Sequence, residues 1–245
     1  MYIDQEKCIT CAKCLPYCPV SAIVVERPSK KIVIDEVHCV ECGACYRSGV
    51  CPTDSFVQNE LVWPRTIRAS LSNPLIVNKE TRIPGRGTEE MKTNDITGRF
   101  KPGHLGIAVE MGRPGTSATF VDIQKVAKVL ASHGVAFCPE NPITFLMTDK
   151  STGEINPEVM NERVLSGILE FEIPLEKADA LLKDVVKVSQ EIDTVFSLDV
   201  ISFVEKDGRI PIYKILKRNG FTPSPDGKNN MGLGKPLFHF YPSNS

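Results

Sequence analysis

Eight of the nine cysteines in this 245-residue chain lie within its first 51 residues, and this crowding constrains the fold more than any other feature. They form two runs, Cys8-x2-Cys11-x2-Cys14-x3-Cys18-Pro19 and Cys39-x2-Cys42-x2-Cys45-x5-Cys51-Pro52. A disulfide framework would more often be spread along the chain, whereas residues 52–245 contain only Cys138. Because we expect no signal peptide at the start of the chain, the short and regular spacing favours bound metal over disulfides.

The bulk composition excludes several classes of protein. Hydrophobic residues make up 42% of the chain and charged residues 24%, which is ordinary for a globular protein. A formal net charge of −1 gives no electrostatic reason to expect nucleic acid or an anionic membrane surface as a partner. The longest apolar runs, such as residues 195–204, are shorter than the roughly 20 residues that span a bilayer. We therefore expect a cytoplasmic protein with no membrane insertion.

The cysteine runs carry a resemblance to a known family. Three cysteines spaced by two residues can wrap one side of a cubane cluster, and the fourth thiolate must then arrive from elsewhere in the chain. The first run matches that of the two-cluster bacterial ferredoxins residue for residue, and the resemblance covers roughly residues 1–60. In that family the fourth cysteine of each run serves the other cluster.

The resemblance implies two [4Fe–4S] clusters as cofactors. It assigns one cluster to Cys8, Cys11, Cys14 and Cys51, and the second cluster to Cys39, Cys42, Cys45 and Cys18. A zinc site is the alternative, but four-cysteine zinc sites usually show two cysteine pairs rather than a run of three closed by Cys-Pro.

The two runs also form an internal repeat. Cys-Ile-Thr-Cys-Ala-Lys-Cys returns 31 residues later as Cys-Val-Glu-Cys-Gly-Ala-Cys, which predicts a pseudo-twofold domain. Residues 22–26 and 31–35 are predicted to be two strands joined by residues 27–30. The second run has five residues before its last cysteine where the common ferredoxin pattern has three, and Gly49 is suited to absorb the extra length. This insertion is either a harmless loop extension or a feature that shifts a potential or forms a docking contact.

Residues 61–103 look like a connector. Prolines and glycines break any long helix there, and basic residues recur along the segment. A free loop of this length is unusual inside a compact protein. The alternatives are a solvated linker and an ordered arm that lies across the body of the protein or across a partner subunit.

Residues 104–205 have regular periodicity and are predicted to form a βαββαβ sandwich with an antiparallel sheet, so that the whole chain is of the α+β class. We expect strands at residues 106–111, 135–138, 144–148, 167–173 and 194–204, and helices at 120–133 and 174–191. The second and third strands are either two short strands or one interrupted strand. Thr119 and Asp122 are expected to cap the first helix. The element order resembles ACT-type regulatory domains and other ferredoxin-like sandwiches, but it carries no functional motif. Residues 206–245 form a C-terminal extension with a short helix at 210–219.

Chemistry outside the cysteine runs is less specific. Glu110, Arg113 and Thr116 follow the first strand of the sandwich and form a candidate ligand loop, for which the alternative is a tight turn. His38 precedes Cys39 and either tunes a cluster through a hydrogen bond or is a polar turn residue. The sequence identifies no catalytic residues.

The function that follows from the resemblance is single-electron transfer. We find no recognisable motif for a flavin or nicotinamide, which two-electron substrate chemistry usually needs. The leading hypothesis is therefore an electron-relay subunit of a larger anaerobic oxidoreductase complex, with a flavin- or metal-containing catalytic subunit as its redox partner. A ligand-responsive regulatory protein and a self-contained iron–sulfur oxidoreductase are the alternatives.

Overall fold

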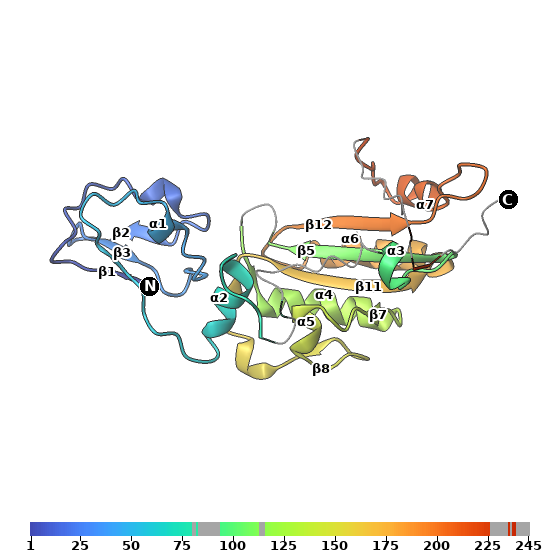
Figure 1. Cartoon of the computed structure of the whole chain (residues 1–245), viewed down its shortest axis with the longest axis horizontal. Coiled ribbons are helices and arrows are strands. Elements are labelled where there is room, and N and C mark those ends of the chain that lie inside the picture. Colours follow the sequence, from blue (N-terminus) through green and yellow to red (C-terminus); the bar gives the residue numbers. More distant parts are fainter. Residues whose placement is uncertain (80–81, 83–93, 113–115, 226–234, 236, 239–245) are drawn as a thin grey trace.

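The computed structural model describes residues 1–79, 82, 94–112, 116–225, 235, 237 and 238. A small N-terminal body and a larger α/β body lie end to end, so that the molecule is elongated (Figure 1). Apolar packing divides the chain in the same way. One cluster of buried residues comprises Met1, Ile3, Ile23, Ile32 and Phe56, while the other draws on residues between 67 and 216.

Two small two-stranded antiparallel sheets frame the N-terminal body. Strand β1 (Tyr2–Ile3) pairs with β4 (Phe56–Val57), and β2 (Ile23–Val25) pairs with β3 (Ile32–Ile34). A 3-10 helix, η1 (Leu15–Tyr17), lies within the first cysteine run, and a short helix, α1 (Ala44–Arg47), lies within the second. The two strands predicted at residues 22–26 and 31–35 are confirmed, each slightly shorter than expected.

The repeat in the sequence is also a repeat in the backbone. The N–H of Cys8 donates to the carbonyl of Asp4 (3.0 Å), and the N–H of Cys39 donates to the carbonyl of Asp35 (2.9 Å). Each cysteine run is therefore entered through the same turn, directly after a strand that carries an isoleucine, Ile3 or Ile34.

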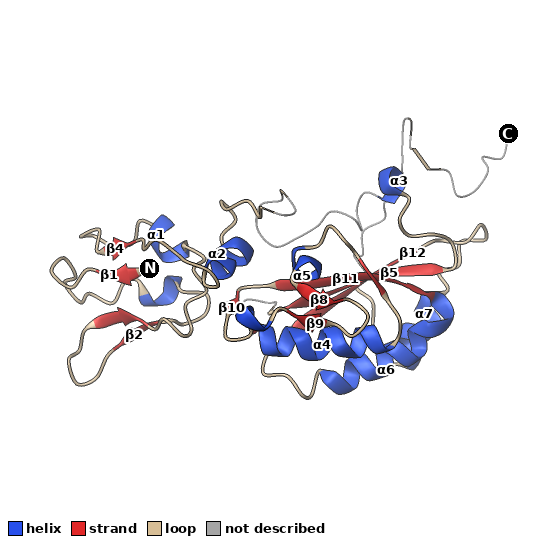
Figure 2. Ribbon diagram, turned by 90° about the horizontal axis from the view of Figure 1, so that it is seen from below, coloured by secondary structure: helices blue, strands red, loops and turns tan. Residues whose placement is uncertain are grey.

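The larger body is built on a four-stranded antiparallel sheet with the strand order β12-β5-β11-β7. Its strands are β5 (His104–Met111), β7 (Ala136–Phe137), β11 (Gly167–Pro174) and β12 (Phe196–Ser202). Helices α4 (Phe120–Ser132) and α6 (Ala178–Val188) cover one face of the sheet (Figure 2). The described elements thus follow the predicted β-α-β-β-α-β order, with additional elements between β7 and β11.

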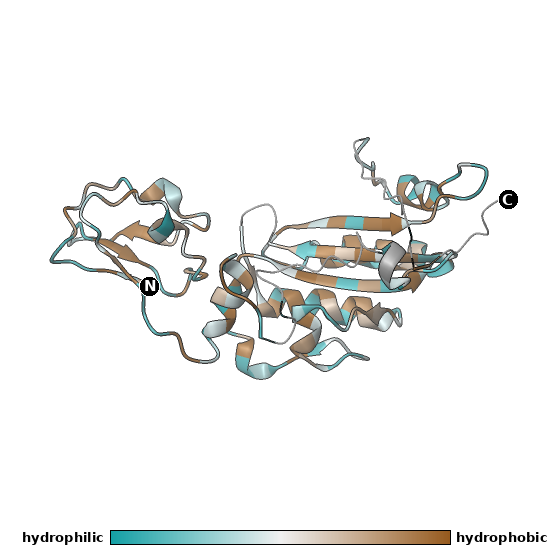
Figure 3. Cartoon of the chain, in the orientation of Figure 1, coloured by the Kyte–Doolittle hydropathy of each residue, from teal (hydrophilic) through white to brown (hydrophobic). Residues whose placement is uncertain are grey.

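The alternating direction of side chains along a strand explains why the helices pack on one face of the sheet. Leu105, Ile107, Val109 and Met111 of β5 are buried in the core with the helices, and hydrophobic residues run along the central strands (Figure 3). The side chain of Thr119 accepts a hydrogen bond from the N–H of Asp122 (3.2 Å), so the predicted cap of α4 is confirmed.

Two boundary predictions are wrong. The helix expected from residue 174 begins later, because the N–H of Leu175 still donates to the carbonyl of Gly103 (2.9 Å) and keeps Pro174 in the strand. A 3-10 turn, η4 (Leu175–Lys177), then leads into α6. The strand expected at 144–148 begins only at Met147, since Asn141 caps a short helix, α5 (Pro142–Phe145), by accepting from the N–H of Ile143 (2.9 Å).

Small elements fill the space between β7 and β11. Strands β8 (Met147–Asp149) and β9 (Glu154–Ile155) form a separate hairpin, followed by a 3-10 helix, η3 (Pro157–Val159). Strand β10 (Arg163–Val164) then pairs with β6 (Ala118–Thr119), which immediately precedes α4. None of the main sheet's ladders involves these strands.

The connector contains a helix that packs on the larger body. Helix α2 (Thr66–Ser72) places Ile67 and Leu71 in the core of that body, and the Ser72 hydroxyl accepts a hydrogen bond from the N–H of Leu165 (2.8 Å). A second short helix, α3 (Asn94–Thr97), follows residues 80–81 and 83–93, which lie outside the described part of the chain. At α2 the connector is therefore packed on the larger body.

The C-terminal extension contributes the short helix that the sequence predicts. Helix α7 (Ile212–Arg218) buries Ile212 and Leu216 in the core of the larger body. None of the helices in the described ranges is both long enough and apolar enough to cross a bilayer.

Candidate metal centre

The structure gathers the eight clustered cysteines into two groups of four. Each group surrounds a hollow in the N-terminal body and takes three members from one run and one from the other. Cys8, Cys11, Cys14 and Cys51 line the first hollow, and Cys39, Cys42, Cys45 and Cys18 line the second. All eight thiols are free of disulfides. This is the grouping that the ferredoxin resemblance implies.

Residues 7–55 match the 4Fe-4S dicluster domain family. No curated protein and no solved structure gives a significant match to the chain. The family match lies within the N-terminal body alone, so it describes only the cysteine-bearing part of the chain.

The backbone of the dicluster domain is shaped around the cysteines. Thr10 and Ala12 have φ angles of 54° and 60°, and the equivalent residues of the second run, Glu41 and Gly43, have φ angles of 54° and 69°. A left-handed conformation costs a non-glycine residue on the order of 1–2 kcal/mol, and such strain persists where a binding site requires it. Turns of this kind aim backbone N–H groups into a common concavity suited to negative charge.

Hydrogen bonds to sulfur repeat in the two halves of the domain. The N–H of Ala22 donates to Sγ of Cys18 (3.1 Å), and the N–H of Ser55 donates to Sγ of Cys51 (3.3 Å). In both cases the donor lies four residues after the cysteine that joins the opposite group. Hydrogen bonds of this type orient thiolate ligands and tune the potential of an iron–sulfur cluster.

The electrostatics of the thiols fit a bound cationic centre. Burial raises the pKa of Cys45 to about 12, and repulsion by the other three thiols of its group adds to the effect. Burial also raises the pKa of Cys51, but hydrogen bonds from Ser55 and Thr53 outweigh it and hold the pKa at about 7. Four thiolates in the second group would repel one another, and a bound metal centre would supply the positive charge that offsets this repulsion.

The spread of the thiols matches a polynuclear centre. Among the residues that the structure describes, no three Cys, His, Asp or Glu side chains are close enough to share one metal ion. In a cubane cluster each thiolate binds a different iron corner, so four thiolates spread around a hollow are the appropriate ligand set.

The insertion in the second run makes specific contacts. Gly49 has a φ of +62° and open space around it, as expected for the residue that absorbs the extra length. Arg47, from the same segment, donates to the carbonyl of Cys42 (2.8 Å) and to the side chain of Asn73 at the end of α2 (2.9 Å). The insertion therefore links the second cysteine run to the connector.

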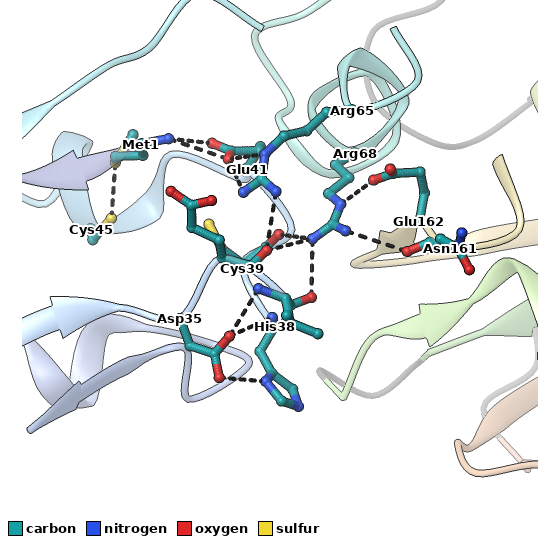
Figure 4. Close-up of polar contacts among 12 residues, drawn as sticks. Met1, Asp35, His38, Cys39, Glu41, Cys45, Arg65, Arg68, Asn161 and Glu162 are labelled. Carbon is teal, nitrogen blue, oxygen red and sulfur yellow. Dashed lines mark hydrogen bonds and ion pairs between the residues drawn. The ribbon is translucent and has the colours of Figure 1, made fainter. Parts of the chain in front are cut away.

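Helix α2 joins the second run to the larger body through Arg68 (Figure 4). Nη1 of this buried arginine donates to the carbonyls of Glu36 (2.9 Å), Val37 (3.0 Å) and Cys39 (2.8 Å). Its Nε donates to the carboxylate of Glu162, which is also buried and belongs to the larger body. The Arg68 side chain thus forms hydrogen bonds with both the N-terminal body and the larger body.

Three further polar contacts lie at this joint, by which we mean the region where helix α2 and the residues before it contact both the N-terminal body and the larger body. Arg65 donates to the carboxylate of Glu41 (2.7 Å), which also accepts from the amino group of Met1 (3.0 Å). The indole Nε1 of Trp63 donates to Glu158 in the larger body (3.0 Å). The sequence analysis missed these roles. The signal available was the spacing of Arg65 and Arg68, which places two guanidinium groups on one side of a helix.

The remaining candidate residues do not join the cysteine groups. The His38 ring bonds the carboxylate of Asp35 (2.7 Å), which supports the reading of His38 as a turn residue. Glu110 lies on β5 and accepts from Ser197 (3.4 Å), while the N–H of Thr116 donates to the carbonyl of Gly112 (3.0 Å). Arg113 lies outside the described residues, so the ligand loop stays a prediction.

Proposed function

We propose that the chain is an electron-transfer protein whose dicluster domain holds two [4Fe–4S] clusters. One cluster is assigned to the group of Cys8 and the other to the group of Cys39, each closed by a cysteine of the opposite run. The observation that carries the proposal is the gathering of eight free thiols into these two cross-run groups. The clusters supply one-electron exchange, and the residues of the chain orient their ligands and tune their potentials.

The chain acts as the relay subunit of a larger anaerobic oxidoreductase in this proposal. A cluster passes one electron at a time, so a flavin- or metal-containing catalytic subunit is the partner that would convert this into substrate chemistry. The fixed joint between the dicluster domain and the larger body supports the relay role, because it holds one cluster site at a set position against a second folded unit. The sheet order further suggests a split βαβ sandwich for the larger body.

Electron uptake under anoxic conditions tests this function. The anaerobically prepared chain is expected to accept about two electrons, one for each cluster, in a stoichiometric titration. An oxidised flavoprotein or metalloprotein from the same source should reoxidise it. Anoxic co-purification identifies that partner. A fully iron-loaded chain that takes up no electrons, or that converts a substrate without any partner, would contradict the relay role.

A further inference from the structure

The two cysteine groups differ in what binds their backbone. In the second run the carbonyl of each of the first three cysteines accepts a side-chain hydrogen bond at 2.8 Å. The donors are Arg68 for Cys39, Arg47 for Cys42 and the Ser48 hydroxyl for Cys45. Within the described residues, no side chain donates to the equivalent carbonyls of Cys8, Cys11 and Cys14.

Charge is also distributed unequally. Four cationic groups belong to the network around the second run: the amino group of Met1, Arg47, Arg65 and Arg68. Two carboxylates, Glu41 and Glu162, pair with three of them, and Arg47 has no carboxylate partner among the described residues. Two further carboxylates lie nearby: Asp35 bonds the His38 ring, and Glu36 is exposed, as Arg47 is. Among the residues that line the hollows, the first hollow has the cation Lys13, and the second has the amino group of Met1 beside Glu41. The two groups therefore differ in the two guanidinium groups, Arg47 and Arg68, that bind carbonyls of ligand cysteines in the second run.

We infer that the cluster of the second run has the higher reduction potential and that Arg47 contributes to the difference. Adding an electron makes a cluster more negative, so nearby cations stabilise its reduced form more than its oxidised form. Arg47 is the suitable residue to test, because it has no carboxylate partner among the described residues and lies in the insertion that distinguishes the second run. This inference rests on the proposed assignment of the two clusters.

The inference gives electron flow a direction. Cys11 is the exposed member of the eight cysteines, so the first group faces the outside of the molecule. With both clusters bound, an external one-electron donor would reduce the first-run cluster there. The electron would then pass to the second-run cluster, which would return the first-run cluster to its oxidised state with no net proton or ligand transfer. Electrons therefore collect on the cluster that lies beside α2 and the larger body.

A potentiometric titration followed by EPR tests this inference on the anaerobically prepared full chain. The Cys18→Ala variant, which lacks the proposed second-run cluster, identifies the couple that belongs to it. In the wild-type chain this couple should be reduced first. The Arg47→Gln variant should lower the equilibrium share of the electron on the second-run cluster about fivefold, because an exposed charge acts through screened solvent. A tenfold change would correspond to about 59 mV for a one-electron couple.

Two controls separate charge from structure. Arg47→Lys keeps the charge and should retain most of the potential difference, whereas Arg218→Gln removes an exposed cation from α7 of the larger body and should change nothing. Equal potentials for the two clusters, an unchanged couple in Arg47→Gln, or the same shift in Arg47→Gln and Arg47→Lys would overturn the inference. A wild-type chain that binds no iron would instead refute the proposed function.

Discussion

Replacing Cys18 with alanine should remove the [4Fe–4S] cluster of the second run, although Cys18 belongs to the first run. The structure places this thiol in the second hollow with Cys39, Cys42 and Cys45, and the N–H of Ala22 orients its sulfur. Without the fourth thiolate the second group cannot close around a cubane. We expect the iron content to fall from about eight to about four atoms per chain, with the EPR signal of the first-run cluster preserved. Iron and sulfide analysis with EPR on the reduced variant measures both effects.

The ninth cysteine provides a matched control. Cys138 is fully buried in the larger body and lies in neither thiol group. The Cys138→Ala variant should therefore keep the full iron content and both EPR signals. If Cys18→Ala lost the first-run signal and kept the second, each run would be closing its own cluster and the cross-run assignment would be wrong.

Replacing Arg68 with methionine should open the joint between the two bodies. The substitution leaves the Glu162 carboxylate buried without its partner and removes the donor shared by three carbonyls. Breaking a buried ion pair in this way typically costs about 3–5 kcal/mol of the free energy of unfolding. Denaturant unfolding of the holoprotein measures the loss. Trp63 is the only tryptophan in the chain and donates to Glu158 across the joint, so its fluorescence reports the opening.

A neighbouring arginine serves as the control for this experiment. Arg65 is more exposed than Arg68, and its removal leaves Glu41 paired with the amino group of Met1. We therefore expect Arg65→Met to lower the free energy of unfolding by clearly less than Arg68→Met. Equal losses in the two variants, or an unchanged Trp63 emission in Arg68→Met, would show that Arg68 does not hold the joint.

The parts of the molecule that follow local rules could be predicted from the sequence. The spacing of the cysteines and the cap at Thr119 depend on residues close together in the chain, and the β5 and β11 strands follow from alternation. Boundaries were less predictable where tertiary contacts override local preference, as at Pro174, which the ladder to β5 keeps in a strand. The Asn141-Pro142 pair was a local signal for α5 that the periodicity analysis overlooked.

The joint could not be derived from the sequence in the same way. Arg68 and Glu162 are 94 residues apart, and nothing near either residue shows that they pair. Their contact depends on α2 packing Ile67 and Leu71 into the core of the larger body, which is a tertiary event. A basic, proline-containing connector looks like a solvated linker until that packing is known.

The metal content of the wild-type chain tests the central claim most directly. Protein prepared and analysed without oxygen should contain about eight irons and a matching amount of acid-labile sulfide per chain, as two [4Fe–4S] clusters require. Tightly bound zinc with little iron, in protein whose cysteines are otherwise intact, would contradict the assignment of the two thiol groups to iron–sulfur clusters.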